Sequence, residues 1–312
     1  MLLAFFIFAS SHFFVLRKNI GVSILPVLFH YANFKKMAAI SISFQASSLL
    51  LIFFEPIAKV AISIVGSLEL VGYYEMASRL TLFAREIFVR PVMFLSGHFA
   101  RVTKDRLDVG KEDLEAVFVL SSVMSFLSLL AVSSLILLLS DLWIGERNIF
   151  FLYSVFCLTV GWCVSLFAIG PYFYSIGTGN NQPHLISCIL ISGFTCLGGL
   201  AAIIVQNVYI IPAGVGLGLV VGELYKIIRV SLNTGFETFS RLTLPLMVSI
   251  IVVVGMGGAI IMVDAIWLSN LELLVRGIML SCLILLPVMS IAFIWKRQCL
   301  LALKTLRGNA TN

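Results

Sequence analysis

The chain alternates between long apolar runs and short polar interruptions, and this pattern predicts its secondary structure. A transmembrane helix needs about 20 apolar residues to cross about 30 Å of hydrocarbon, and most of the runs reach that length. Because the runs are continuous, they predict helices and not the alternating strands of a membrane β-barrel. We therefore expect an all-α polytopic membrane protein with about nine transmembrane helices. The nine runs are Leu2–Leu16, Met37–Val65, Leu80–Ala100, Ala116–Ser140, Ile149–Phe173, Leu185–Val205, Val208–Ile228, Leu242–Val263 and Leu273–Trp295.

The composition agrees with this prediction and excludes several classes of protein. Of the 312 residues, 60% are hydrophobic and only 12% are charged, whereas soluble domains carry about 25% charged residues. So few charges cannot cover the surface of a soluble protein of this size. The chain is therefore not a soluble enzyme, a nucleic-acid-binding domain or a disordered protein.

Lysine and arginine residues are distributed unevenly among the predicted loops. Fifteen of the 21 lie in alternate loops and in the C-terminal tail, and basic residues favour the cytoplasmic side of a membrane. Lys226 and Arg229 are counted among them, in the seventh loop. The net charge of +6 is thus explained by membrane orientation, no nucleic-acid partner is implied, and we expect a cytoplasmic C-terminus.

The first apolar run is shorter than the others. As a helix, Leu2–Leu16 would extend about 22 Å, which is too short to span the membrane. No basic segment precedes the run and no small-residue cleavage site follows it, as a secretory signal peptide would require. We expect the chain to begin partway through a transmembrane helix.

Three short motifs occur in order along the chain and point to a family. The first is V-G-Y-Y-x-x-A-x-R-L, the second is L-W-I-G at Leu142–Gly145, and the third is Y-F-Y-S-I-G-T-G at Tyr172–Gly179. The first motif comprises Val71, Gly72, Tyr73, Tyr74, Ala77, Arg79 and Leu80. Together they resemble polysaccharide-type flippases (O-antigen and oligosaccharide-lipid flippases) of the multidrug/oligosaccharidyl-lipid/polysaccharide (MOP) exporter superfamily.

The resemblance implies a fold and a division of the chain. Members of the family have two lobes in a MATE-like arrangement, with twelve to fourteen spans, and this chain would correspond to the C-terminal lobe of an N-terminally truncated member. Residues 1–36 would be a remnant of the last N-lobe helix with a cytoplasmic linker. Residues 37–230 would form the six-helix C-terminal lobe, and residues 231–312 two additional helices and a cytoplasmic tail.

Charged residues inside predicted spans carry the functional signal, because a charge at the bilayer centre costs at least about 2.5–3.5 kcal/mol. Glu55 and Lys59 are four residues apart, so they share one helix face and can pair. Gln45 falls near the same stripe, and Pro56 interrupts the helical hydrogen bonding beside the pair.

The next predicted helix carries a second charged stripe. Arg79, Glu86 and Arg90 recur at intervals of 7 and 4 residues on one face, whereas Arg85 lies about 100° away. Arg79 is expected at the membrane edge, in the loop that precedes this helix.

Two interpretations of these stripes remain open. In the functional one, both stripes face a central aqueous cavity, where Lys59, Arg79 and Arg90 attract a pyrophosphate group. Glu55 or Glu86 would neutralise the cations in the empty site or bind a coupling proton. In the structural one, the ion pairs only fix helix packing, and the arginines extend to the membrane interface.

Two further features are given a structural interpretation. Glu223 and Lys226 are interpreted as a local pair at the membrane interface. The repeat Gly214-x-Gly216-x-Gly218 lies within a predicted span, where small residues allow close helix packing, and it is not a nucleotide-binding motif.

The expected function is that of a flippase, which translocates polyprenyl-diphosphate-linked oligosaccharide across the cytoplasmic (inner) membrane for cell-surface polysaccharide synthesis. No catalytic motif is present, so we do not expect an enzyme, and the scattered cysteines and histidines suggest no metal site or cofactor. A drug or cation antiporter of the same superfamily is the main alternative. An integral-membrane glycosyltransferase or polymerase is a weaker one, because it would need a long extracytoplasmic loop.

The expected partners follow from the resemblance. They are a lipid-linked oligosaccharide, membrane lipid and a coupling ion, either a proton or sodium. A separate N-terminal half and polysaccharide assembly proteins are further expected partners.

Overall fold

In the computed structural model, the described part of the chain is helical. It comprises residues 31–90, 93, 117, 121, 125, 128, 132, 136, 139–145 and 148–234, and none of these residues forms a strand. The helices are α2 (Tyr31–Val65), α3 (Leu68–Val89), α6 (Ile149–Phe167), α7 (Ile169–Gly177), α8 (Gln182–Val205) and α9 (Ile210–Thr234).

Several expectations concern residues outside this part. The predicted runs Leu2–Leu16, Leu242–Val263 and Leu273–Trp295 are not described, and Ala116–Ser140 is described only at single positions. The total of nine spans therefore stays a prediction.

The chain divides into two compact units, 1–42 and 43–312, whose boundary falls within α2. The described residues of the first unit, 31–42, are the first turns of that helix. The helix begins six residues before the predicted run, so residues 31–36 are helical. It also continues through Pro56.

Within the described residues, four helical segments are long and apolar enough to cross a membrane. They are Ser41–Val65, Ile149–Phe167, Gln182–Val205 and Ile210–Asn233. These four segments and the wholly helical described structure support an all-α membrane protein.

Helix α3 differs from these four because it is rich in charge. Its 22 residues would extend about 33 Å, but they include Glu69, Glu75, Arg79, Arg85 and Glu86. The prediction that this helix begins at Leu80 is wrong. Ser67 caps a helix that begins at Leu68, and its hydroxyl accepts a hydrogen bond from the backbone N–H of Leu70. Hence Arg79 lies in the middle of α3 and not in a loop.

The motif glycines end two helical segments. Gly145, in the L-W-I-G motif, has φ +79°, and Gly179, after α7, has φ +71°. Side chains with a Cβ rarely adopt such backbone angles, so glycine suits both turns. The V-G-Y-Y motif lies inside α3 and not at its start, with Tyr74 and Ala77 fully buried.

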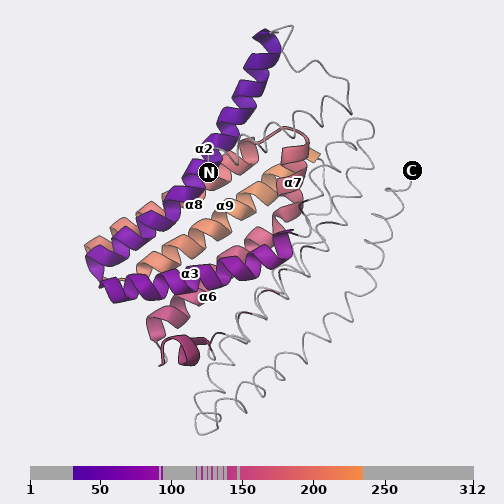
Figure 1. The fold of residues 1–312 in the computed structure, drawn as a ribbon. Coiled ribbons are helices and arrows are strands. Elements are labelled where there is room, and N and C mark those ends of the chain that lie inside the picture. The colour runs from indigo at the N-terminus through magenta and orange to yellow at the C-terminus, as the bar shows by residue number, and fades with distance from the viewer. Residues whose placement is uncertain are drawn as a thin grey trace, which may run out of the picture. The chain divides into compact units, whose positions relative to one another are not determined.

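Helix α9 packs against α8 on one side and α6 on another (Figure 1). A Cβ atom added at Gly214 would lie 2.8 Å from the Cα of Gly198 on α8, so the two backbones touch. One added at Gly216 would lie 2.6 Å from the carbonyl oxygen of Cys157 on α6. The packing interpretation of the glycine repeat is therefore confirmed.

Hydroxyl groups and one amide join the helices within the bundle. Asn181, between α7 and α8, donates hydrogen bonds through Nδ2 to Ser43 Oγ (3.1 Å) and Ser47 Oγ (3.3 Å) of α2. Ser192 of α8 donates to the carbonyl oxygen of Leu50, at 3.1 Å. Such interhelical hydrogen bonds supplement van der Waals packing where the surroundings are apolar.

Candidate functional site

Helices α2 and α3 are joined by a chain of ion pairs. Lys59 on α2 lies 3.5 Å from Glu55 on its own helix and pairs across the helix interface with Glu75 on α3. Glu75 also accepts a hydrogen bond from Arg79 Nε at 2.6 Å, and Ser78 donates to Glu55 Oε1 at 2.5 Å. The four ionised groups are balanced in charge, and the network fixes α3 against α2.

A second ionic group lies near the end of α3. Glu86 pairs with two guanidinium groups, Arg85 Nη1 through Oε1 and Arg90 Nε through Oε2, each at 3.2 Å. The two arginines differ in exposure, because the side chain of Arg90 is 76% exposed and that of Arg85 only 24%. Among the described residues, one carboxylate therefore serves two cations, which gives this end of α3 more positive than negative charge.

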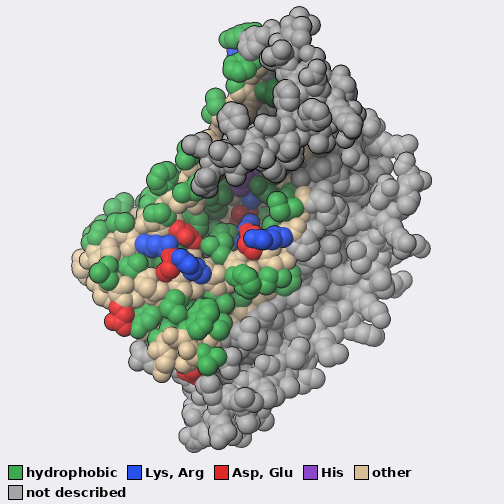
Figure 2. All heavy atoms as spheres, viewed as in Figure 1, with side chains coloured by type: hydrophobic (Ala, Val, Ile, Leu, Met, Phe, Trp, Pro, Cys, Tyr) green, Lys and Arg blue, Asp and Glu red, His purple; other side chains and the backbone are tan. Residues whose placement is uncertain are grey.

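The exposed face of α3 combines charge with apolar groups. Arg79, whose side chain is 78% exposed, lies on the same face as the exposed Phe83 and Ile87. Figure 2 shows acidic and basic side chains beside one another on this face, bordered by hydrophobic side chains. Such a surface cannot face lipid without cost, so it indicates contact with water or with another protein segment.

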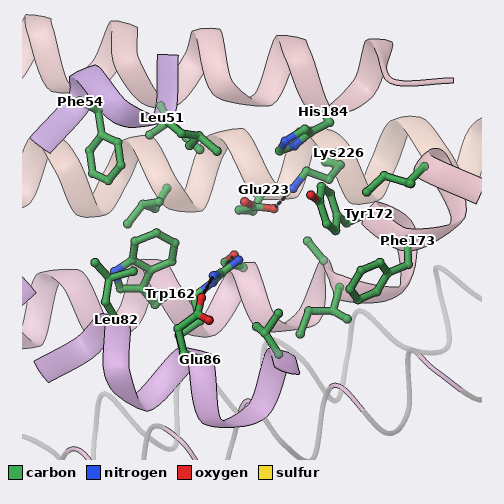
Figure 3. Close-up of a pocket in the computed structure, with 18 of the residues that line it drawn as sticks. Leu51, Phe54, Leu82, Glu86, Trp162, Tyr172, Phe173, His184, Glu223 and Lys226 are labelled. Atoms are coloured by element: carbon green, nitrogen blue, oxygen red, sulfur yellow. Dashed lines mark hydrogen bonds and ion pairs between the residues drawn. The ribbon is translucent and has the colours of Figure 1, made fainter. Parts of the chain in front are cut away.

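A cavity of about 750 Å³ lies inside the bundle, and residues of all six described helices line it. This volume is in the range of ligand-binding pockets, about 300–1,000 Å³. The lining combines aromatic and aliphatic groups with several ionisable ones (Figure 3). The ionisable residues are Glu55, Arg85, Glu86, Tyr172, His184, Glu223 and Lys226.

Arg85 is held in the cavity wall by three neighbours. Its guanidinium carbon lies 4.9 Å from the ring centroid of Trp162, its Nε donates to Ser165 Oγ at 3.4 Å, and it pairs with Glu86. A cation over an indole face is attracted by the ring quadrupole. This arrangement orients the planar guanidinium group of Arg85 in the cavity wall.

The opposite wall carries a buried ion pair. Lys226 Nζ lies 2.5 Å from Glu223 Oε2, and the two side chains are only 4% and 7% exposed. The ammonium also lies 5.3 Å from the ring centroid of Tyr172, whose ring meets that of His184 edge-on at 4.8 Å. Figure 3 shows these four side chains together on the wall away from Trp162 and Glu86.

This arrangement corrects the interpretation of Lys226. The sequence pattern placed it in a cytoplasmic loop and the pair at the membrane interface, but α9 continues to Thr234 and Lys226 is buried within it. The pairing with Glu223 was predicted, and the structure shows it.

The structure separates the seven predicted site residues into two groups. Glu55, Arg85 and Glu86 line the cavity, whereas Lys59, Arg79, Arg90 and Gln45 are not among its lining residues. Gln45 is exposed on α2. Arg85, which was expected to lie off the charged stripe, is the arginine that lines the cavity, about 120° from Arg79 around α3.

One pattern in the sequence could have identified Lys226 as a buried residue of the site. Gly214, Gly218 and Gly222 face α8 at intervals of four, and Lys226 is the next position in that series. A lysine that continues a small-residue stripe is expected on the buried side of its helix. Glu75, Trp162, Tyr172 and His184 carry no comparable pattern.

Comparison with models of protein families, with curated proteins and with solved structures finds no match to this chain.

Proposed function

We propose that this protein is a flippase, which translocates polyprenyl-diphosphate-linked oligosaccharide across the cytoplasmic membrane for cell-surface polysaccharide synthesis. The observation that carries the proposal is the sharing of Glu86 between Arg85 and Arg90. Within the part of the chain that the structure describes, it leaves an excess guanidinium group on a helix of a membrane bundle. An excess cation is costly there, and an anionic ligand would offset that cost.

The chemistry of the two arginines fits a diphosphate. A guanidinium group donates two parallel hydrogen bonds to phosphate oxygens and keeps its charge. Arg90 is exposed, and Arg85 is oriented by Trp162. The lipid tail of such a substrate would remain in hydrocarbon, beside the exposed apolar side chains of the helices, while its head group crosses.

The proposal includes the mechanism and setting that the sequence resemblance implies. Translocation would proceed by alternating access between two MATE-like lobes, with this bundle as the C-terminal lobe and its C-terminus in the cytoplasm. The charged face of α3 would border the second lobe, which a separate N-terminal half would supply. A proton or sodium ion would drive the cycle.

A drug or cation antiporter is a second candidate, and one observation favours it. Among the described residues, three carboxylates, Glu55, Glu86 and Glu223, line the cavity, against two basic side chains, Arg85 and Lys226. Acidic groups beside aromatic rings are typical of sites that bind organic cations.

Reconstitution into vesicles tests the two candidates. The full chain would be placed in liposomes, with and without a co-expressed N-terminal half, and the movement of a fluorescent lipid-linked oligosaccharide would be measured beside the efflux of a cationic dye. We expect oligosaccharide movement, and a reduction of about tenfold or more for Arg85→Gln. Glu69→Gln, which changes an exposed carboxylate outside the cavity, is the matched control. Dye efflux without oligosaccharide movement would establish the antiporter instead.

A further inference from the structure

The ionised groups of the cavity are paired with one another or with close neighbours. Glu223 pairs with Lys226, Glu86 with Arg85, and Glu55 with Lys59 just outside the cavity. Each carboxylate that lines the cavity therefore has a cation within 3.5 Å. The excess positive charge belongs to Arg90, which does not line the cavity.

The two cations of the cavity have the same kind of surroundings on opposite walls. Arg85 has a carboxylate, Glu86, and an indole ring, Trp162, whereas Lys226 has Glu223 and the ring of Tyr172. Both walls thus present an aromatic ring beside a neutral pair of charges.

Such pairing decides which ligands the cavity accepts at low cost. At the wall formed by Glu223 and Lys226, an anion or an organic cation would have to separate a buried pair and leave one charge without its partner, which is unfavourable in an apolar interior. A neutral ligand with many hydroxyl groups leaves the pairs intact. Each hydroxyl both donates and accepts hydrogen bonds, so it can accept from the cations and donate to the carboxylates.

The aromatic side chains complete such a site. The face of an aromatic ring carries partial negative charge, which attracts the C–H groups on the flat side of a sugar ring. Trp162 and Tyr172 supply rings on two walls, with Phe54 and Phe173 beside them in the lining. The indole N–H of Trp162 is buried and, within the described residues, has no hydrogen-bond partner.

We propose that this cavity binds uncharged sugar residues beside the pair Glu223–Lys226 and is the saccharide subsite of the transporter, while the diphosphate meets the arginine side chains of α3. This assignment rests on the proposed function, which supplies the substrate. It extends that function by giving the sugar residues and the diphosphate of the substrate different binding positions. The sugar lies between Trp162 and the pair Glu223–Lys226, and the diphosphate lies toward Arg90.

Tryptophan fluorescence offers a direct test, because Trp162 lines the cavity. The chain has four tryptophans, so Trp143→Phe, Trp267→Phe and Trp295→Phe leave Trp162 as the single reporter. The full chain carrying these changes would be purified in detergent micelles. It would be titrated separately with neutral tri- to pentasaccharides, inorganic pyrophosphate and tetraphenylphosphonium. We expect a saturable change in emission with at least one saccharide and none with tetraphenylphosphonium.

A variant links this response to the ion pair. Glu223→Gln with Lys226→Met removes both charges together, so no unpaired charge is left in the bundle. We expect it to weaken saccharide binding about tenfold, since hydrogen bonds from charged groups are lost. Glu69→Gln should bind as the parent does. If the double variant does not fold, Tyr172→Leu, which removes one ring and leaves the pair, should weaken binding in the same direction.

The outcomes separate this assignment from the proposed function. A saturable response to pyrophosphate alone would make the cavity an anion site, and a response to tetraphenylphosphonium alone would make it a cation site. Silence with every probe would leave it without a ligand-binding role. Any of these results overturns the saccharide subsite, even if vesicles still flip lipid-linked oligosaccharide. Saccharide binding without flipping would instead overturn the transport function and keep the subsite.

Discussion

Lys226 and Glu223 lie one turn apart on α9, with 2.5 Å between Nζ and Oε2, and both side chains are almost completely buried. Their charged ends reach the cavity beside Tyr172 and His184. Two ions in the interior of an apolar bundle are tolerable only as a pair. A change to either residue should therefore affect both the stability of the bundle and the charge in the cavity wall.

Neutralising one residue of this ion pair should destabilise the protein more than neutralising both. Lys226→Met leaves the carboxylate of Glu223 buried without its cation, and we expect a loss of about 3–5 kcal/mol in stability. The double variant Glu223→Gln, Lys226→Met should lie within about 1 kcal/mol of the parent, because it leaves no unpaired charge. Thermal unfolding in detergent, followed by circular dichroism, measures both. Equal losses in the single and double variants would argue against a true ion pair.

The contact between α8 and α9 depends on the absence of side chains at Gly198 and Gly214. A Cβ at Gly214 would lie 2.8 Å from the Cα of Gly198, and since that atom is backbone, the helices must separate. We expect Gly214→Ala to cost about 1–3 kcal/mol in the same unfolding measurement.

Gly193 on α8 provides the matched control for this substitution. A Cβ added there meets nothing within 4 Å, and alanine favours a helix over glycine by about 0.5–1 kcal/mol. Gly193→Ala should therefore be neutral or slightly stabilising. If it destabilised as much as Gly214→Ala, helix contact would not be the cause.

The side chain of Asn181 links the start of α8 to α2. Asn181→Ala removes its hydrogen bonds to Ser43 and Ser47, and each such bond in a membrane bundle contributes about 0.6 kcal/mol. We expect a loss of about 1 kcal/mol in unfolding free energy. Ser48→Ala should change stability by less than about 0.5 kcal/mol, because among the described residues the Ser48 hydroxyl bonds only to the carbonyl oxygen of Phe44 on its own helix. A similar effect of both changes would contradict an interhelical role for Asn181.

Removing the charge of Arg85 should affect transport, whereas removing the charge of Lys59 should affect stability. Arg85→Gln leaves Glu86 paired with Arg90, so we expect the fold to persist while oligosaccharide movement in vesicles falls about tenfold. Lys59→Gln leaves Glu55 without its cation and removes the link to Glu75, so stability should fall by about 1–2 kcal/mol. Unfolding and transport measured on the same preparations distinguish the two. If Arg85→Gln lost stability but kept full transport, Arg85 would have a structural role and not a role in transport.

Local features of this bundle could be predicted from the sequence. The ion pairs Glu55–Lys59 and Glu86–Arg90 followed from spacing of four residues, since helix geometry alone places such positions together. The start of α6 at Ile149 coincides with the start of its apolar run. The start of α3 was missed because its first turns are too charged to extend an apolar run, although Ser67 is a good helix cap.

The sequence by itself determined the features that depend on residues close together in the chain and on the surrounding solvent. Continuous apolar runs specify helices in a membrane, and spacing along a helix specifies which charges on it can pair. Only the tertiary structure decided which faces meet. It brought Lys59 to Glu75 across two helices, placed Arg85 and not Arg79 in the cavity wall, and buried Lys226 where a loop was expected. These outcomes depend on the rotation of each helix about its axis, which is set by interlocking side chains such as Gly198 and Gly214 from distant parts of the chain.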